Sequence, residues 1–179
     1  MQKDFTQFEQ RKRDHLQLAL EASNQARGLA GLDSIRLVHE ALPELDLNEI
    51  RLETQCLGRS LATPFNISGM TAGHADAVEL NLRMARACEK RGWAFGVGSQ
   101  RRALEAREKD ADFEAIRRAA PEVFLIGNLG LSQLVSADPT RIPRGGDAIA
   151  IHLNSLQEAL QPEGTPRFRR VPQARASGL

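Results

Sequence analysis

Side chains suited to holding an anion follow the second of four short apolar runs in this chain. The run AFGVG, residues 94–98, leads directly into Ser99, Gln100, Arg101 and Arg102. A hydroxyl, an amide and two guanidinium groups together match the oxygen atoms of a ligand such as phosphate. The segment matches neither GxGxxG nor a P-loop, so a nucleotide-binding interpretation has weak support. A solvated helix start is the alternative.

The first and third runs end in small and polar residues. PFNI is followed by SGMT at residues 68–71, and FLIGNLG spans residues 124–130. Glycine permits close backbone approach and hydroxyl groups form hydrogen bonds, which is what a flat cofactor on the rim of a sheet requires. A plain tight turn explains SGMT equally well when it is taken alone.

The fourth run ends in groups that suit a metal-bound anion. AIAIHLN, residues 148–154, places His152 and Asn154 on one side of a strand because side chains alternate with a period of two. Gln157 and Glu158 follow at the start of the next helix. One carboxylate among amides suits Mg²⁺, which usually keeps water and takes substrate phosphate. Compensation of the helix dipole is the simpler explanation of Glu158.

The four runs indicate a repeat of strand and helix. They begin roughly 25 to 30 residues apart, the length of one strand, one helix and two loops. Parallel βα units place the carboxyl ends of their strands on one rim, where ligand-binding groups collect. We expect helices at residues 76 to about 91, Phe113 to Ala120, Leu129 to Val135 and 155 to 160. A polar segment, residues 101–112, leads into the helix around Phe113 to Ala120.

A leader precedes the repeat. Residues 3–25 have helical spacing of apolar side chains, and Ile50 to Thr54 and Gln55 to Ser60 could pair as a small hairpin. Arg11 and Lys12 lie on the leader helix, where such a cluster is most often a solvated charged face. We therefore divide the chain into a leader and hairpin (1–62), a βα repeat (63–164) and an arginine-containing tail (165–179).

Composition limits the function classes. The chain has 179 residues, 41% hydrophobic content and no apolar stretch of the ~20 residues that span a bilayer. We expect a cytoplasmic protein that inserts into no membrane. Four of the 24 basic residues lie in the tail, so the rest has 20 basic against 23 acidic residues, which argues against a nucleic-acid surface. Cys56 and Cys88 have no zinc-site spacing, and Cys88 is expected to be a core residue.

Together these segments resemble one family. RKRDH at 11–15, PFNISGMTAG, GVGSQR, GNLG, HLN, QE and QPEG occur in the order and spacing of the type 2 isopentenyl-diphosphate isomerases, over about residues 8–164. The resemblance implies an α/β TIM (β/α)8 barrel of which about four βα units are present. It also implies FMN, Mg²⁺ and the interconversion of isopentenyl and dimethylallyl diphosphate, with NADPH or another reductant keeping the flavin reduced. A homo-oligomer is expected for the full-length protein.

The resemblance also implies site residues. Those on the substrate are Arg11, Lys12, Ser99, Gln100, Arg101 and Gln157. Those lining the flavin are Gly69, Met70, Thr71, Ser99 and Asn128. His152, Asn154 and Gln157 would be the catalytic residues facing the substrate, and Glu158 would hold Mg²⁺.

The chain departs from that family in two places. Ala72-Gly73 replaces the common glycine pair, and the residues after QPEG at 161–164 do not continue the family pattern. We interpret the chain as a truncated form diverging near residue 165. The alternatives are another FMN-dependent TIM-barrel oxidoreductase of the α-hydroxy-acid oxidase type, and an inactive fragment.

Overall fold

The computed structural model describes residues 10, 13–14, 17–28, 31–71, 75–106, 111–136, 140, 142, 145–160 and 164. The chain divides into two compact units, residues 1–52 and 53–179. In the first unit the described residues between 10 and 20 are helical. Three short 3-10 turns without buried residues follow, η1 (Ala22–Asn24), η2 (Leu32–Ser34) and η3 (Leu47–Glu49). The leader helix therefore ends earlier than residue 25, and the tail from 165 lies outside the described residues.

The second unit begins with the expected hairpin. Strands β1 (Thr54–Cys56) and β2 (Arg59–Leu61) pair antiparallel, with Thr54 opposite Leu61. Leu57 and Gly58 connect them with φ values of 48° and 84°. A two-residue connection with positive φ at both positions follows the right-handed twist of the strands. A hairpin is present as predicted, but its turn at Leu57 and Gly58 lies inside the second predicted piece, so the paired residues differ from those expected.

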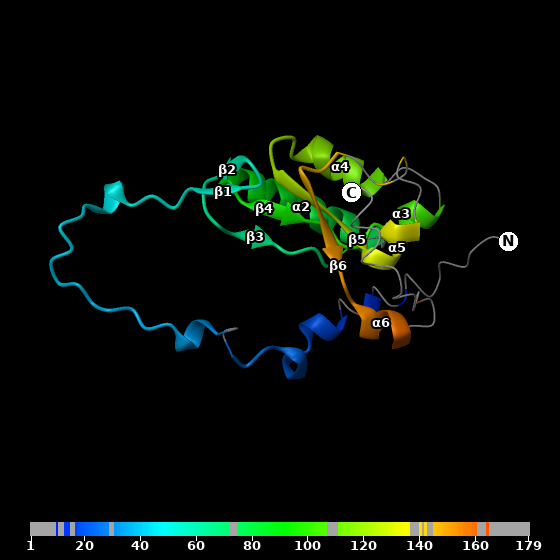
Figure 1. Cartoon of the computed structure of the whole chain (residues 1–179), viewed down its shortest axis with the longest axis horizontal. Coiled ribbons are helices and arrows are strands. Elements are labelled where there is room, and N and C mark those ends of the chain that lie inside the picture. Colours follow the sequence, from blue (N-terminus) through cyan, green and yellow to red (C-terminus); the bar gives the residue numbers. More distant parts are fainter. Residues whose placement is uncertain are drawn as a thin grey trace. The chain divides into compact units, whose positions relative to one another are not determined.

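A four-stranded parallel sheet carries the βα repeat (Figure 1). The strands are β3 (Asn66–Ile67), β4 (Ala94–Gly96), β5 (Phe124–Gly130) and β6 (Ala148–His152). Their order in the sheet is the order in the sequence, and every neighbouring pair is parallel. This is the arrangement of half of an eight-stranded barrel. The predicted fold class is confirmed.

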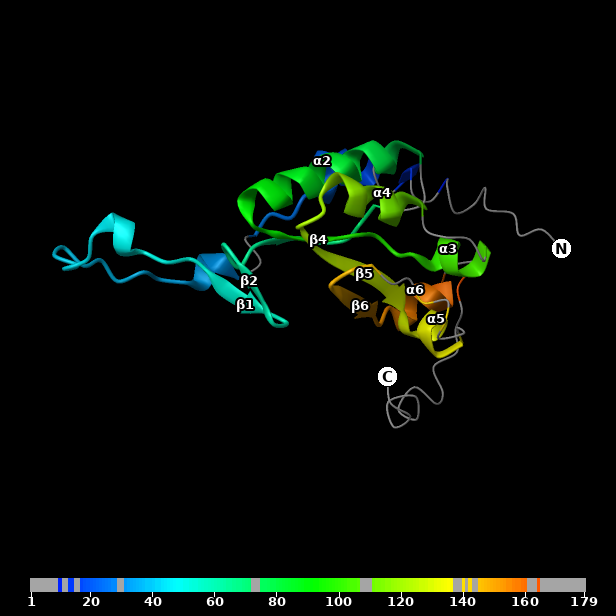
Figure 2. The same ribbon diagram turned by 90° about the horizontal axis from the view of Figure 1, so that it is seen from above.

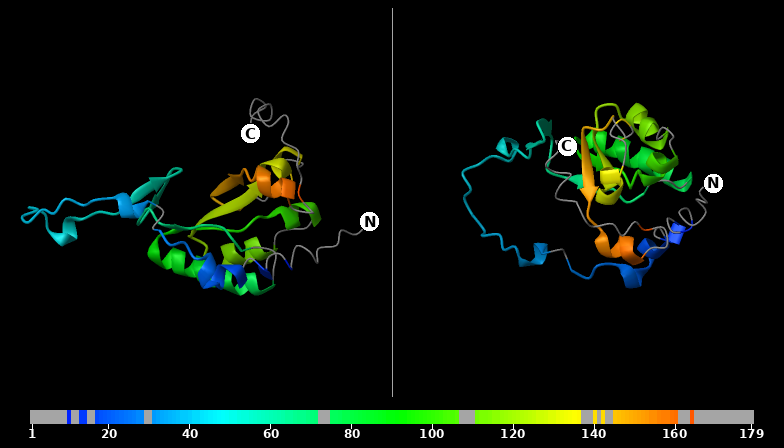
Figure 3. Two further views of the ribbon diagram at one scale, coloured as in Figure 1. Left: turned by 90° about the horizontal axis from the view of Figure 1, so that it is seen from below. Right: turned by 45° about the vertical axis from the view of Figure 1, so that its right-hand side comes forward.

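The helices fall into two groups. Helices α2 (Ala75–Arg91) and α4 (Ala111–Ala119) lie together on one side of the sheet (Figures 2 and 3). The short helices α3 (Arg101–Ala106), α5 (Leu131–Ser136) and α6 (Ser155–Leu160) gather near the carboxyl ends of β4, β5 and β6 (Figure 2). Helix α3 was not predicted, and β5 continues to Gly130 where a helix was expected from Leu129. Within the described residues, no helix combines the length and apolar character needed to cross a bilayer.

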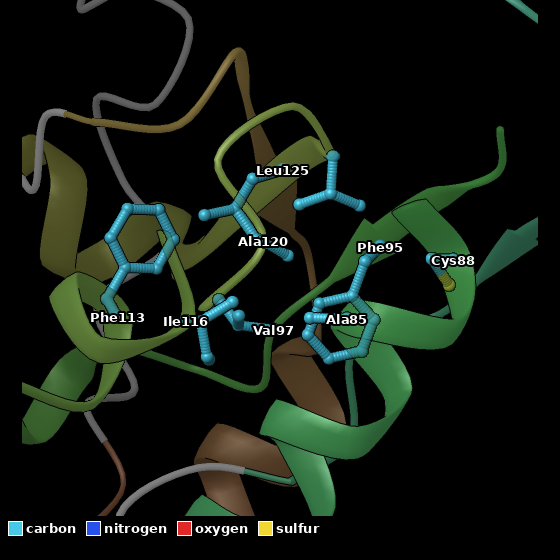
Figure 4. Close-up of a cluster of buried hydrophobic side chains, with 9 residues drawn as sticks. Ala85, Cys88, Phe95, Val97, Phe113, Ile116, Ala120 and Leu125 are labelled. Carbon is cyan, nitrogen blue, oxygen red and sulfur yellow. The ribbon is translucent and has the colours of Figure 1, made fainter. Parts of the chain in front are cut away.

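The main core lies between the sheet and the pair α2 and α4. Phe95, Val97 and Leu125 point from alternate strand positions toward Ala85 and Ile116 of the helices (Figure 4). Cys88 belongs to this cluster with no exposed surface, as predicted. Burial raises the pKa of its thiol, and a backbone hydrogen bond with Ile67 offsets part of that rise. The outward strand positions therefore anchor the sheet on its helices.

The opposite face of the sheet is the inner face of the half barrel. Ala94 and Phe124 pack there against Leu61 of the hairpin, with Ile126 and Ala148 beside them. The hairpin thus covers the end of this face where the strands begin. These contacts lie away from the polar residues at the carboxyl ends of the strands.

A charged cluster ties the strand starts together. The carboxylate of Asp147, just before β6, accepts hydrogen bonds from Arg59 of β2 at 2.6 Å, from Arg117 of α4 at 2.8 Å and from the Leu125 N–H at 2.8 Å. Partial burial opposes the charge, but the Leu125 N–H and the two guanidinium groups outweigh it and hold the pKa of Asp147 below its usual value. This cluster joins four elements at the end opposite the rim.

Candidate functional site

The loop after β3 lies directly on the end of β4. A Cβ atom on Gly69 would lie 1.9 Å from the Val97 carbonyl oxygen, and one on Gly96 would lie 2.9 Å from the Gly69 nitrogen. Only glycine at both positions allows this approach. Thr71 completes the anchoring, because its backbone carbonyl accepts hydrogen bonds from the Gly98 N–H at 3.1 Å and from the buried Asn81 amide at 3.0 Å. The SGMT segment is therefore fixed on the rim.

Gln100 joins the ends of β4 and β5. Its N–H donates to the Asn128 carbonyl at 2.9 Å, and its side-chain oxygen accepts the Asn128 N–H at 3.0 Å. The side chain lies over Gly127, where a Cβ would come 2.7 Å from Oε1 of Gln100. Gln100 is 3% exposed. This expected substrate-binding residue extends the pairing of two strands beyond the ladder and thereby fixes the backbone of Asn128.

The side chains of Asn128 and His152 meet at the rim. The Asn128 Oδ1 and the His152 Nδ1 are 2.8 Å apart. The two residues come from neighbouring strands, β5 and β6, and the sequence analysis placed them in different roles, flavin contact and substrate contact. Because an amide oxygen only accepts, this contact places a proton on Nδ1 of the imidazole.

Arg101 links the second βα unit to the fourth. Its Nε donates to Glu105 at 2.7 Å within α3, and its Nη1 lies 3.5 Å from Oε2 of Glu158 on α6. The side chains of Arg101 and Glu158 are 10% and 12% exposed. The predicted anion-binding arginine and the predicted metal ligand are therefore neighbours in a poorly hydrated place, where charge interactions are strong. Glu105 was missed in the sequence, although its i,i+4 spacing from Arg101 was a usable signal.

Four of the remaining predicted site residues are described by the structure, and two are not. Asn154 and Gln157 are exposed, and the Asn154 amide donates to the Gln157 Oε1 at 2.9 Å across the first turn of α6. Met70 is 61% exposed, and Ser99 is half-buried. The two leader residues Arg11 and Lys12 lie outside the described residues.

A sequence profile described as "FMN-dependent dehydrogenase" matches residues 9–119, more than half of the chain. The chain belongs to the FMN-dependent dehydrogenase family. Family membership agrees with the parallel βα order of the sheet and with the flavin expected from the sequence.

Curated relatives indicate a more specific similarity than the family profile does. A protein of Legionella pneumophila (strain Lens) named isopentenyl-diphosphate delta-isomerase is 46% identical over 173 residues, which are 94% of this chain and 51% of the relative. Proteins of the same name from Bdellovibrio bacteriovorus and Halobacterium salinarum are each 44% identical, over 94% and 90% of this chain and 51% and 46% of their own length. The chain spans about half the length of the curated relatives it matches.

The rim of this family member fits a flat cofactor such as FMN. Barrel interiors are usually filled by bulky branched side chains. Strand alternation here places Gly96 and Gly98 at the end of β4 and Ala148 and Ala150 of β6 on the inner face. The Gly69 loop covers the end of β4, where a Cβ on Gly69 would also approach Nδ2 of Asn128 to 3.3 Å. Small side chains, a fixed backbone loop and one amide form a surface on which a planar ring can lie.

The fit for a divalent cation rests on Glu158. Among the described residues, no group of three or more His, Cys, Asp or Glu side chains is close enough to hold a metal ion. Mg²⁺ is commonly bound through one or two carboxylates together with substrate phosphates and water. The donor set on this rim therefore suits a cation that arrives with an anionic ligand, rather than a preformed metal cage.

Proposed function

We propose that this chain supplies one half of the active site of an isomerase that interconverts isopentenyl and dimethylallyl diphosphate. The observation that carries the proposal is the pairing of Arg101 with Glu158 on the rim of a chain 46% identical to a protein named isopentenyl-diphosphate delta-isomerase. A guanidinium group and a carboxylate side by side can hold a diphosphate and its cation together. The substrate in this proposal is a small isoprenoid diphosphate.

The rim residues divide the work of binding. Arg101 donates charge-assisted hydrogen bonds to the diphosphate, and Glu158 holds Mg²⁺ against it. Ser99 and Gln157 donate to the same ligand, while Gln100 acts from its buried place beside Asn128. Arg11 and Lys12 of the leader add positive charge in this proposal, on the resemblance of their motif alone.

The flavin contacts follow the loop after β3. Gly69, Met70 and Thr71 line the ring of FMN, and Ser99 and Asn128 reach it from the next two strand ends. When bound, reduced FMN supplies the acid–base chemistry that moves the double bond, and NADPH or another reductant keeps it reduced. The contact between Asn128 and His152 supports this placement, because it brings a flavin-side and a substrate-side residue within hydrogen-bond distance.

His152, Asn154 and Gln157 orient the substrate. Shifting a double bond adds a proton at one carbon and removes one from another, with positive charge developing between them. Neutral amides and an imidazole can surround such a hydrocarbon without quenching the charge, while the diphosphate is held at Arg101. Cytoplasmic location and assembly into a homo-oligomer complete the proposal for the whole protein.

The test joins residues 1–164 to the carboxyl-terminal half of the Legionella pneumophila relative. The fusion should bind FMN and isomerise isopentenyl diphosphate with reduced flavin and Mg²⁺. The 179-residue chain alone should bind FMN poorly and show no turnover, because the closed, water-excluding pocket needs both halves. Arg101→Ala should raise the KM for the diphosphate at least tenfold, and Arg83→Ala, at an exposed position on α2, is the matched control.

Two results would contradict the proposal. One is robust isomerase activity of the 179-residue chain by itself, and the other is a folded fusion that binds no FMN. The family match also favours a second candidate, oxidation of α-hydroxy acids. A fusion that reduces its flavin with hydroxy acids and leaves isopentenyl diphosphate unchanged would select that activity instead.

A further inference from the structure

Gln133 on α5 lies in the interior beside the rim. The residue is 5% exposed, and both polar atoms of its side chain are shielded from solvent. A buried carboxamide is costly unless it lies among polar groups. A role for Gln133 could not be predicted from the sequence, because a glutamine in a short helix belongs to no motif. Its burial on a six-residue helix suggests that its position matters.

The glycine at the end of β5 makes room for this side chain. A Cβ on Gly130 would lie 1.9 Å from Oε1 and 3.1 Å from Cδ of Gln133. The same Cβ would lie 2.9 Å from Nε2 of His152. The Gln133 oxygen and the His152 nitrogen are therefore no farther apart than the sum of 1.9 Å and 2.9 Å. Any side chain at position 130 would displace one or both.

The two nitrogens of His152 thus face different amides. Nδ1 lies 2.8 Å from Oδ1 of Asn128, and Nε2 faces the side of Gly130 on which the Gln133 carboxamide lies. We propose that Gln133 is a positioning residue that holds the Nε2 side of His152 and fixes the orientation of the ring. A carboxamide suits this task because its oxygen can accept from a protonated Nε2 and its NH₂ group can donate to a neutral one.

This assignment refines the proposed function, because it concerns the histidine expected to face the substrate. The Asn128 oxygen at Nδ1 and a carboxamide beside Nε2 would together limit rotation of the ring when an anion binds beside it. The Nδ1–H tautomer is set by Asn128 at the end of β5, and Gln133 of α5 would keep the ring in place, in the way that second partners orient functional histidines elsewhere. Asn128 and Gln133 together would give the His152 ring one fixed orientation toward the substrate.

The test uses the charge of a glutamate as a probe of distance. In the 179-residue chain, Gln133→Glu should raise the pKa of His152 by at least one unit, because an opposite charge within about 4–6 Å shifts a pKa by 1–3 units. Val135→Glu places the same charge on the exposed side of the same helix and should leave that pKa nearly unchanged. NMR titration of the four histidines measures it, with His152→Asn identifying the resonance. Arg101, Arg102, Glu105 and Glu158, the described charged residues of α3 and α6, are unchanged in every variant.

A second pair of variants guards against misfolding. Gln133→Met keeps the length of the side chain but removes its polar atoms, so the ¹⁵N shifts of the His152 ring should change, because Nε2 loses its polar neighbour, while the fold is retained. Gly130→Ala should also change these shifts, because its Cβ would displace the carboxamide, the imidazole or both. Equal His152 titration in Gln133→Glu and Val135→Glu, or unchanged ring shifts in folded Gln133→Met, would overturn the assignment. Neither readout requires isomerase activity, so the assignment and the proposed function can fail separately.

Discussion

Replacing Asp147 should lower the free energy of unfolding by more than replacing a residue of any exposed ion pair among the described residues. Its carboxylate accepts hydrogen bonds from Arg59, Arg117 and the N–H of Leu125, and Leu125 has no exposed surface. Asp147→Ala leaves that buried N–H without its acceptor, at a cost of about 1–3 kcal/mol. Arg59 is 40% and Arg117 26% exposed, so solvent screens their contributions to about 0.5 kcal/mol each. The expected loss is about 3 kcal/mol for Asp147→Ala and less for Asp147→Asn.

The assay is urea unfolding followed by the fluorescence of the single tryptophan, Trp93, whose ring centroid lies 5.4 Å from that of Phe65. Glu79→Gln is the control, because its partner Arg83 lies on the same exposed helix face and the two side chains are 61% and 74% exposed. The control should change the unfolding free energy by less than about 0.5 kcal/mol.

The same variant should change the dependence of stability on pH. The folded-state pKa of Asp147 is lowered, so its contribution is complete above the unfolded value of about 3.9 and is lost as the pH falls through the folded value. The difference in unfolding free energy between the wild-type chain and Asp147→Asn should therefore be constant above about pH 5 and shrink below pH 4. This account of the cluster would be refuted if Asp147→Asn lowered the unfolding free energy at pH 7 by no more than Glu79→Gln does. It would also be refuted if the difference between wild type and Asp147→Asn increased in acid.

Three further outcomes are expected. Gly69→Ala should lower the unfolding temperature sharply, because its Cβ would lie 1.9 Å from the Val97 carbonyl oxygen, and an unchanged melting curve would show that the loop is free to move. Glu158→Gln in the fusion should weaken Mg²⁺-dependent turnover with FMN binding almost unchanged, whereas an equal loss of flavin in equilibrium titration would indicate a structural role. Cys56 should react with a thiol reagent in the native chain while Cys88 reacts only after denaturation, since Cys88 is buried with a raised pKa, and two equivalents of fast reaction would contradict this.

The strands and their order could be predicted because their signals are local. Each apolar run ends at glycine or a small polar residue, and helix α6 at Ser155–Leu160 and the end of α2 at Arg91 fall where the sequence indicated. Helix α3 was missed because half of Arg101 to Ala106 is charged and the segment is too short to show an apolar period. The spacing of apolar residues predicts a helix poorly where charged side chains cover much of the helix surface.

The contacts within the site were less predictable. Nothing in the sequence states that Gln100 is 3% exposed or that its side chain lies over Gly127, because that depends on how two strand ends approach. The pairing of Arg101 with Glu158 joins residues of two βα units for the same reason. The βα repeat predicted that these strand ends share one rim, and only the structure shows which of the residues contact each other.

The cluster at Asp147 also constrains when the chain can finish folding. Arg59 and Asp147 are separated by 88 positions in the sequence. At synthesis rates of about 5–20 residues per second, roughly 4–18 s pass between the emergence of the hairpin and that of its carboxylate partner. During this interval the apolar side of the hairpin has no complete sheet to cover. Chaperone contact with a nascent chain should therefore begin at the hairpin and end when β6 has been made.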